Sequence, residues 1–252
     1  MSDTSAPPAA NDGMPPPMFY IQPEPLMPNV HKDLKIRPET DFAFAATTNT
    51  IPITVPEFPL VARHFPIMFL GPELVPTAAV GFNPDTNLFV DAKGQWERMS
   101  YIPAYVRRYP FILLGQDGDE RLHLGVDSSA RSAKEGARAL FENDKETAAV
   151  PQALTFCEQF HNAFMVTREF SLAMKASGIV EERDLELELA PGQISKVGSF
   201  QRVSEEKFKA LPDATILDWH KKGILHSVYF HLQSLNNWDM LLIKGAERNG
   251  TS

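Results

Sequence analysis

The segment from Trp96 to Phe111 carries the side chains of this chain that are best suited to binding chemistry. It reads Trp-Glu-Arg-Met-Ser-Tyr-Ile-Pro-Ala-Tyr-Val-Arg-Arg-Tyr-Pro-Phe. Guanidinium groups beside aromatic rings can hold an anionic or aromatic ligand through paired hydrogen bonds and stacking. With one acidic residue just upstream, the candidate ligand-binding residues are Asp91, Trp96, Tyr101, Tyr105, Arg107, Arg108 and Tyr109.

A proline in this segment predicts how these side chains are arranged. If Pro103 opens a short helix, Tyr105 and Tyr109 stand one turn apart on one face. Arg108 then lies near that face and Arg107 lies off it. A structural role predicts that at least one guanidinium is buried against carboxylates or backbone carbonyls. A binding role predicts unused donors in a concave, tyrosine-lined pocket, and the sequence leaves both roles open.

Outside this segment we find no recognisable catalytic motif. The 14 glycines form no phosphate loop, dinucleotide fingerprint or Gly-x-Ser-x-Gly turn. The single cysteine, Cys157, stands beside Glu158, which raises a thiol pKa rather than activating the thiol. His226 and His231 are spaced i, i+5, so they do not share a helix face as zinc-binding pairs do. We therefore expect no catalytic residue, no metal site and no cofactor.

Charge and cysteine content narrow the class of protein. The formal net charge is −8, which disfavours a nucleic-acid partner, because phosphate binding depends on clustered Lys and Arg. One cysteine cannot form an intramolecular disulfide, which favours a reducing compartment. No segment approaches the ~20 apolar residues of a membrane span, and the first residues lack the regions of a secretory signal. We expect a soluble, cytoplasmic protein without a membrane span.

The first half of the chain is typical of short strands joined by turns. Its apolar segments are short and are bounded by Pro, Gly, Asn and Asp. An Asp117-Gly118 pair predicts a hairpin turn between the last two strands. The predicted strands are Ile51–Thr54, Ile67–Leu70, Thr77–Phe82, Phe111–Leu114 and Leu122–Val126.

The second half is dominated by helices. Aromatic residues and a methionine recur at mostly three- and four-residue steps, which predicts a core helix over Pro151–Ser177 that ends at Gly178. The residues of this face are Phe156, Phe160, Phe164, Phe170 and Met174. Alternating charges and leucines predict a second hairpin from Asp184–Leu189 and Ile194–Val203. Helices are expected over Ala214–Lys222 and Ile224–Ile243.

These elements predict an α+β fold, with antiparallel sheets in the N-terminal half packed against helices from the C-terminal half. The domain organisation that we expect is a disordered proline-rich tail over residues 1–29, a single α+β domain over 30–244 and a flexible C-terminal tail over 245–252. Prolines in the first segment fix φ and remove backbone donors, which disfavours helices and central strands. An apolar island, Met18–Ile21, is expected to dock on the body of the protein rather than on a partner.

Several of these strings resemble the bacterial SapC family. They are Tyr101–Phe111, Asn87–Asp91 with Gly94 and Trp96, His31–Lys35, Leu140-Phe141, Leu211-Pro212-Asp213 and His231–Leu235, and the resemblance runs from about residue 17 to 244. The name of the family comes from an association with surface-layer gene clusters, and members are often labelled as peptide-transport proteins. The resemblance supplies no established catalytic residue.

The sequence and the resemblance together favour a non-enzymatic binding or assembly factor that acts on a protein or peptide client. The resemblance implies a link to surface-layer or uptake systems. One alternative is an enzyme that modifies a peptide or an aromatic small molecule, with a site built from Asp91, Tyr101, Tyr105, Arg107 and Arg108. Another is a structural component of the surface layer, which would require export. A homo-oligomer is compatible with each of these.

Overall fold

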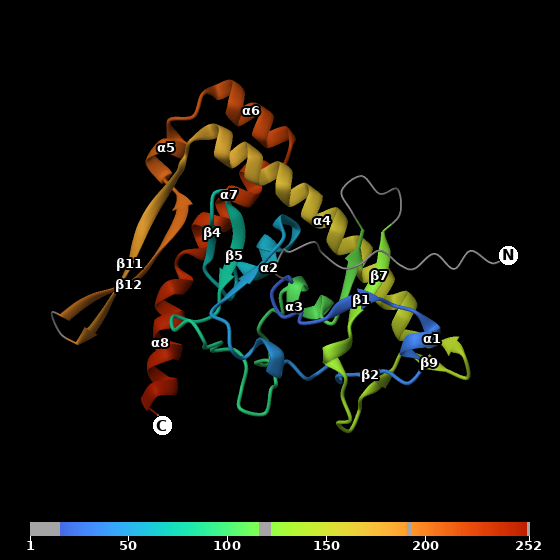
Figure 1. The fold of residues 1–252 in the computed structure, drawn as a ribbon. Coiled ribbons are helices and arrows are strands. Elements are labelled where there is room, and N and C mark those ends of the chain that lie inside the picture. Colours follow the sequence, from blue (N-terminus) through green and yellow to red (C-terminus); the bar gives the residue numbers. More distant parts are fainter. Residues whose placement is uncertain (1–15, 116–121, 191–192, 251–252) are drawn as a thin grey trace.

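The computed structural model describes residues 16–115, 122–190 and 193–250. The fold is α+β, as expected: short antiparallel sheets come mainly from the first half of the chain and helices from the second half (Figure 1). Among the shortest strands, β2 (Lys35–Ile36) pairs with β8 (Arg138–Ala139), and β9 (Phe141–Glu142) pairs with β10 (Lys145–Glu146).

A three-stranded antiparallel sheet lies beside one end of the longest helix. Its strand order is β1 (Pro23–Pro25), β7 (His123–Asp127), β6 (Phe111–Leu114). The expected pairing of the segments 111–114 and 122–126 is confirmed, with a shift of one residue in β7. The Asp117-Gly118 turn lies outside the described residues. β1 is an edge strand, where prolines without an N–H can be accommodated.

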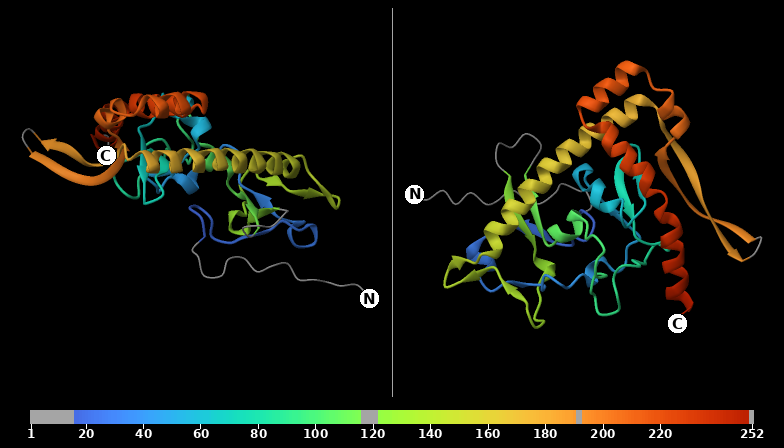
Figure 2. Two further views of the ribbon diagram at one scale, coloured as in Figure 1. Left: turned by 90° about the horizontal axis from the view of Figure 1, so that it is seen from above. Right: turned by 180° about the vertical axis from the view of Figure 1, so that it is seen from behind.

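A five-stranded antiparallel sheet lies at the other end. Its order is β11 (Val180–Ala190), β12 (Gln193–Val203), β4 (Ile67–Leu70), β5 (Val75–Ala79), β3 (Thr50–Pro52). β5 begins two residues before the predicted strand, because Leu70 pairs with Val75 directly across the turn. The second predicted hairpin is confirmed. It meets β4 at a single pair, Gln201 with Phe69, so most of the hairpin projects from the body (Figure 2).

The helix α4 (Ala149–Ser177) contacts both sheets and ends, as predicted, at Gly178 in the left-handed conformation. The prediction that its aromatic face is buried is wrong in part. Phe170 and Met174 are 3% and 0% exposed, but Phe164 is 50% exposed. Between residues 158 and 166 no side chain of α4 is buried. The helix packs on a separate apolar cluster near each of its ends, and its middle turns lie between them.

Six helices shorter than α8 and the C-terminal helix itself complete the architecture of the described residues: α1 (Pro28–His31), α2 (Phe58–Val61), α3 (Ala104–Arg108), α5 (Glu205–Lys209), α6 (Asp213–Lys221) and α7 (Ile224–Ser234), followed by α8 (Asn237–Gly250). The predicted helix over 224–243 is thus two helices. Side chains on both sides of the break bond to the backbone of other segments. Ser234 Oγ accepts from the Ile67 amide at 2.9 Å, and Asn237 Nδ2 donates to the Ala62 carbonyl at 2.8 Å. The expected C-terminal tail is helical through Gly250.

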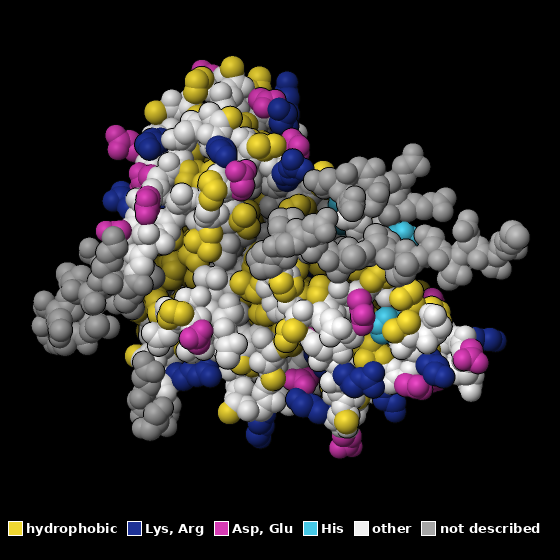
Figure 3. Space-filling view, viewed as in Figure 1, with side chains coloured by type: hydrophobic (Ala, Val, Ile, Leu, Met, Phe, Trp, Pro, Cys, Tyr) yellow, Lys and Arg dark blue, Asp and Glu magenta, His cyan; other side chains and the backbone are white. Residues whose placement is uncertain are grey.

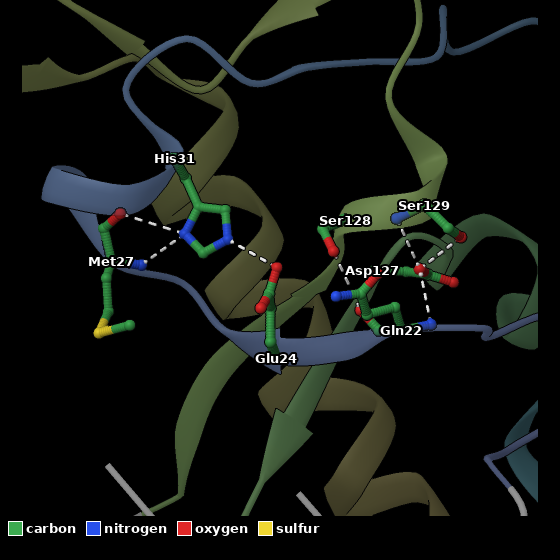
Figure 4. A network of polar contacts seen from close by, with 7 residues as sticks. All are labelled: Gln22, Glu24, Met27, His31, Asp127, Ser128 and Ser129. Atoms are coloured by element: carbon green, nitrogen blue, oxygen red, sulfur yellow. Dashed lines mark hydrogen bonds and ion pairs between the residues drawn. The ribbon is translucent and has the colours of Figure 1, made fainter. Parts of the chain in front are cut away.

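The N-terminal segment is ordered earlier than expected, from residue 16 onward, so the predicted boundary at residue 29 is too late. Tyr20 is 3% exposed, and its hydroxyl donates to the Phe111 carbonyl at 2.5 Å. Asp127 is buried, and its carboxylate accepts from the amide of Ile21 at 2.8 Å. It also accepts from the amide of Gln22 at 3.1 Å (Figure 4). These hydrogen bonds hold the segment against the body of the protein, although its prolines have no N–H to donate. Residues 1–15 of the predicted tail lie outside the described residues.

Candidate functional site: a groove between α3 and α4

The start of α3 follows Pro103, as the sequence predicts, and is fixed by a buried carboxylate. Glu57 Oε1 accepts from the Ala104 amide at 2.6 Å and from the Tyr101 hydroxyl at 3.1 Å. Its Oε2 accepts from the amide and the hydroxyl of Thr54, both at 2.8 Å. Burial and the negative charge of Glu57 raise the pKa of Tyr101 to about 12. The helix is therefore held in one position against the segment that precedes α2.

A groove of about 580 Å³ lies between α3, α4, β5 and β6. Apolar and aromatic side chains form most of its wall, among them Ile112, Phe160, Phe164 and Leu172. Figure 3 shows hydrophobic side chains gathered on the middle of the face that Figure 1 presents. Positive groups are added by Arg108, Arg168 and Lys175.

Arg108 stands in this groove with its guanidinium stacked on aromatic rings. The Cζ atom lies 4.4 Å from the ring centroid of Phe160, 4.8 Å from that of Tyr105 and 5.6 Å from that of Tyr20. Such stacking holds the guanidinium plane in place. The Nε atom is buried and has no hydrogen-bond partner among the described residues. A buried donor without a partner is costly, so it is the atom of this site that most needs an acceptor.

Arg107 points elsewhere, as the sequence analysis expected. Its side chain is exposed, and its Nε donates to the Ile102 carbonyl at 3.0 Å. One terminal nitrogen also donates to the Tyr101 hydroxyl at 3.1 Å, and the Cζ atom lies 5.2 Å from the Phe156 ring centroid. These contacts fasten the loop before α3, and Arg107 does not line the groove.

The two tyrosines expected on one face of α3 have different surroundings. Tyr105 lines the groove, and its hydroxyl donates to the Met18 carbonyl at 3.3 Å. Tyr109 follows the last helical residue and stacks on Phe44, with ring centroids 4.3 Å apart. Burial and the nearby Asp127 raise the pKa of Tyr109 to about 12. Because α3 ends at Arg108, the helical spacing does not carry Tyr109 into the groove.

Asp91 and Trp96 also lie outside the groove. Asp91 Oδ1 accepts from the amides of Lys93 at 2.9 Å and Gln95 at 2.8 Å, so it closes its own turn. Trp96 is 7% exposed and belongs to the hydrophobic core. Its Nε1 donates to Ser100 Oγ at 2.8 Å. Of the seven candidate residues, the structure brings Tyr105 and Arg108 into the groove.

The sequence analysis missed the part of the groove that α4 supplies. Phe160 and Phe164 were assigned to the core, and Arg168 and Lys175 were not considered. A signal was present, because both basic residues follow Phe164 at helical steps of four and eleven residues, which places them near its face. A helix face that is buried along its whole length seldom carries arginine or lysine side chains.

Cys157 borders the groove but is 2% exposed. Burial raises the pKa of its thiol to about 11, and the nearby Arg108 acts in the opposite direction. The thiol is therefore protonated at neutral pH and is a poor nucleophile.

The described residues also lack two features that would define other classes of protein. In those residues, no three His, Cys, Asp or Glu side chains gather as they would around a metal ion. No helix within the described part of the chain has the length and apolar character needed to cross a membrane.

The fold and the groove define an α+β protein with an open, mainly apolar site to which α3 and α4 both contribute. The chain belongs to the SapC family: the family model described as SapC matches residues 26–241, most of the chain. A search of curated proteins and a search of solved structures each gave no match. The matched range includes every groove residue named above.

Proposed function

We propose that this protein is a non-enzymatic binding or assembly factor whose α3–α4 groove holds an extended apolar segment of a protein or peptide client. The observation that carries the proposal is Arg108. Its guanidinium is stacked on three rings inside an apolar groove, and its Nε lacks a partner among the described residues. A client carbonyl or carboxylate would supply the missing acceptor.

The size and lining of the groove support a ligand site. Ligand pockets typically measure about 300–1,000 Å³ and combine apolar walls with a few polar groups. The groove has about 580 Å³. Three of its apolar side chains remain well exposed in the folded chain: Phe164 at 50%, Leu172 at 47% and Val75 at 41%. A contiguous apolar surface of this kind favours association with a partner.

The dispersal of the candidate residues favours binding over catalysis. An enzyme that modifies a peptide or an aromatic small molecule would have used Asp91, Tyr101 and Arg107 together with Tyr105 and Arg108. The side chains of the first three are engaged in hydrogen bonds outside the groove. The thiol of Cys157, with its pKa near 11, supplies no ready nucleophile.

The proposal includes a cytoplasmic site of action, which the sequence analysis favours. It also includes a link to surface-layer or uptake systems, which the family resemblance implies. A structural component of the surface layer would have to be exported. Fractionation of the source cells separates these two possibilities: recovery with the surface layer would contradict the cytoplasmic assignment.

The groove is tested by a matched pair of charge insertions. Phe164→Asp places a charge on the groove wall, whereas Leu217→Asp places one on α6, at a side chain 55% exposed that does not line the groove. Both variants should melt near the wild type because neither site is buried. Capture of the client from a lysate of the source cells should fall roughly tenfold or more for Phe164→Asp, a loss of about 1.4 kcal/mol. Equal capture by both variants would contradict the proposal.

A further inference from the structure

We propose that the client segment held in the α3–α4 groove is acidic: an extended stretch of apolar residues whose carboxylates are bound by Arg108 and Arg168. The inference rests on the proposed function, because it names the chemistry of the client that this groove holds. Three features of the described residues carry it: the sign of the charges that line the groove, their arrangement along α4, and the polar groups that the fold leaves unused.

The groove is basic although the chain as a whole is acidic. The formal net charge of the chain is −8. Among the described residues that line the groove, however, Arg108, Arg168 and Lys175 stand against one carboxylate, that of Glu73. Glu73 is itself paired with Lys175 at 3.2 Å. Because salt screens exposed charges beyond about 8 Å at physiological ionic strength, these local positive groups dominate the field that a ligand in the groove experiences.

The basic side chains of α4 form a line along the groove. His161, Arg168 and Lys175 all line it, and they follow one another at steps of seven residues. Seven residues make nearly two helical turns, so these side chains leave the same side of α4 at intervals of about 10 Å. Phe164 and Leu172 stand four residues before and after Arg168 and flank it on the same face. An extended segment that follows α4 therefore meets apolar surface and positive charge together.

The hydroxyl groups that α4 brings to the groove are already used by the fold. Thr167 Oγ1 donates to the Ala163 carbonyl at 2.7 Å and accepts from the Val55 amide at 2.9 Å. Ser171 Oγ donates to the Leu74 carbonyl at 3.1 Å. With these donors engaged, polar recognition of a ligand falls to the positively charged side chains.

Two guanidinium groups remain for a ligand. Arg108 is stacked on aromatic rings, and its buried Nε has no partner among the described residues. Arg168 is exposed, and within the described part of the chain its guanidinium has no hydrogen bond or ion pair. A backbone carbonyl could accept from Arg108 Nε, but a carboxylate also compensates the charge. Guanidinium groups bind carboxylates through paired, charge-assisted hydrogen bonds, which are stronger than those to neutral acceptors.

Selection from a random peptide library displayed on phage tests the acidic preference. The full chain is used as bait, and peptides retained by the wild type but not by Phe164→Ser are taken as groove-dependent. Phe164→Ser removes apolar surface from the groove wall without adding a charge, so the comparison does not itself favour acidic peptides. We expect groove-dependent peptides in which Asp or Glu is interspersed with apolar residues. A neutral or basic set would overturn the inference, and the absence of any groove-dependent peptide would contradict the proposed function as well.

A matched pair of charge reversals assigns the preference to the groove. Arg168→Glu changes a residue that lines the groove, whereas Lys221→Glu makes the same change in net charge on α6, outside the groove. Both positions are exposed, so both variants should fold as the wild type does. Fluorescence anisotropy with the selected peptides should show affinity falling roughly fivefold or more for Arg168→Glu and less than about twofold for Lys221→Glu.

Peptides in which the carboxylates are replaced by amides complete the test. They should bind the wild type roughly tenfold or more weakly than the acidic peptides do. Equal losses in Arg168→Glu and Lys221→Glu, or undiminished binding of the amide peptides, would overturn the assignment of the carboxylates to Arg108 and Arg168. If client capture remains sensitive to Phe164→Asp in that case, this inference alone is lost and the proposed function stands.

Discussion

Two charged residues near α3 show how differently the fold treats a charge. The carboxylate of Glu57 accepts four hydrogen bonds, from Thr54, Tyr101 and the Ala104 amide, and so is fully used by the structure. The guanidinium of Arg108 has ring contacts but leaves its Nε without a partner among the described residues. The first arrangement fixes a helix, and the second is suited to an incoming acceptor.

A buried histidine makes stability depend on pH. His231 is 0% exposed, and its Nε2 accepts from the Val203 amide at 3.0 Å. Burial lowers its pKa from 6.5 to about 3. Between these values the unfolded chain binds a proton that the folded chain does not. The free energy of unfolding should therefore fall as the pH drops below 6.5, by up to about 1.4 kcal/mol per pH unit.

Chemical denaturation at several pH values between 7 and 4 checks this prediction. Acidic groups also titrate in this range, so the comparison is between variants. His231→Gln keeps an acceptor for the Val203 amide and should show a flatter profile than the wild type. His226→Gln, at an exposed position of the same helix, should keep the wild-type profile. The same slope in all three proteins would show that His231 is not the group responsible.

At the scale of single residues, sequence reasoning found part of the site for a definite reason. Pro103 fixed the start of α3, so the places of Tyr105 and Arg108 on it were predictable. The end of α3 was not predictable, and with it the place of Tyr109. Asp91 lies outside the groove because it closes its own turn, and Trp96 lies outside it because it packs in the core. The spacing of these residues in the sequence does not predict such contacts.

At the scale of elements, α4 shows the limit of helical periodicity. The three- and four-residue spacing correctly predicted the helix and placed its aromatic residues near one face, but it could not indicate what covers that face. Phe170 meets Phe58 and Phe69, while Phe164 meets the open groove. Burial along one helix therefore changes with the element beneath it.

This difference gives a stability prediction for α4. Phe170→Ala should lower the free energy of unfolding by about 3–5 kcal/mol, because a side chain that is 3% exposed leaves a cavity. Phe164→Ala should lower it by less than about 1 kcal/mol, because that side chain is already half exposed. Urea denaturation of the two variants tests both values. Similar losses would mean that the groove is closed in solution.

The N-terminal elements depend on a partner that is remote in sequence. β1 pairs with β7, and Asp127 accepts hydrogen bonds from amides more than a hundred residues earlier. The proline content of residues 16–29 therefore predicted less order than the structure has. In the same way, the hairpin of β11 and β12 was predictable from alternation, but its junction with β4 was not.

At the scale of the whole molecule, the sequence predicted the α+β class and most of the helices and strands. The order of strands within the sheets could not be predicted from the sequence, because that order joins segments such as β4 and β12 that lie far apart in the chain. The groove arises at this scale, because α4 spans from one sheet to the other while α3, β5 and β6 border the space beneath it. A binding site there is a product of the arrangement and not of a local motif.

The most direct test of the binding groove compares Arg108→Met with Arg107→Met, in both thermal melting and client capture. Arg108 lines the groove with an unpartnered Nε, whereas Arg107 is its neighbour in sequence and lies outside the groove. We predict that Arg108→Met melts near the wild type and loses capture roughly tenfold or more, about 1.4 kcal/mol, while Arg107→Met retains capture. If Arg108→Met melts early and its remaining folded fraction still captures the client fully, the arginine is structural and the binding groove is contradicted.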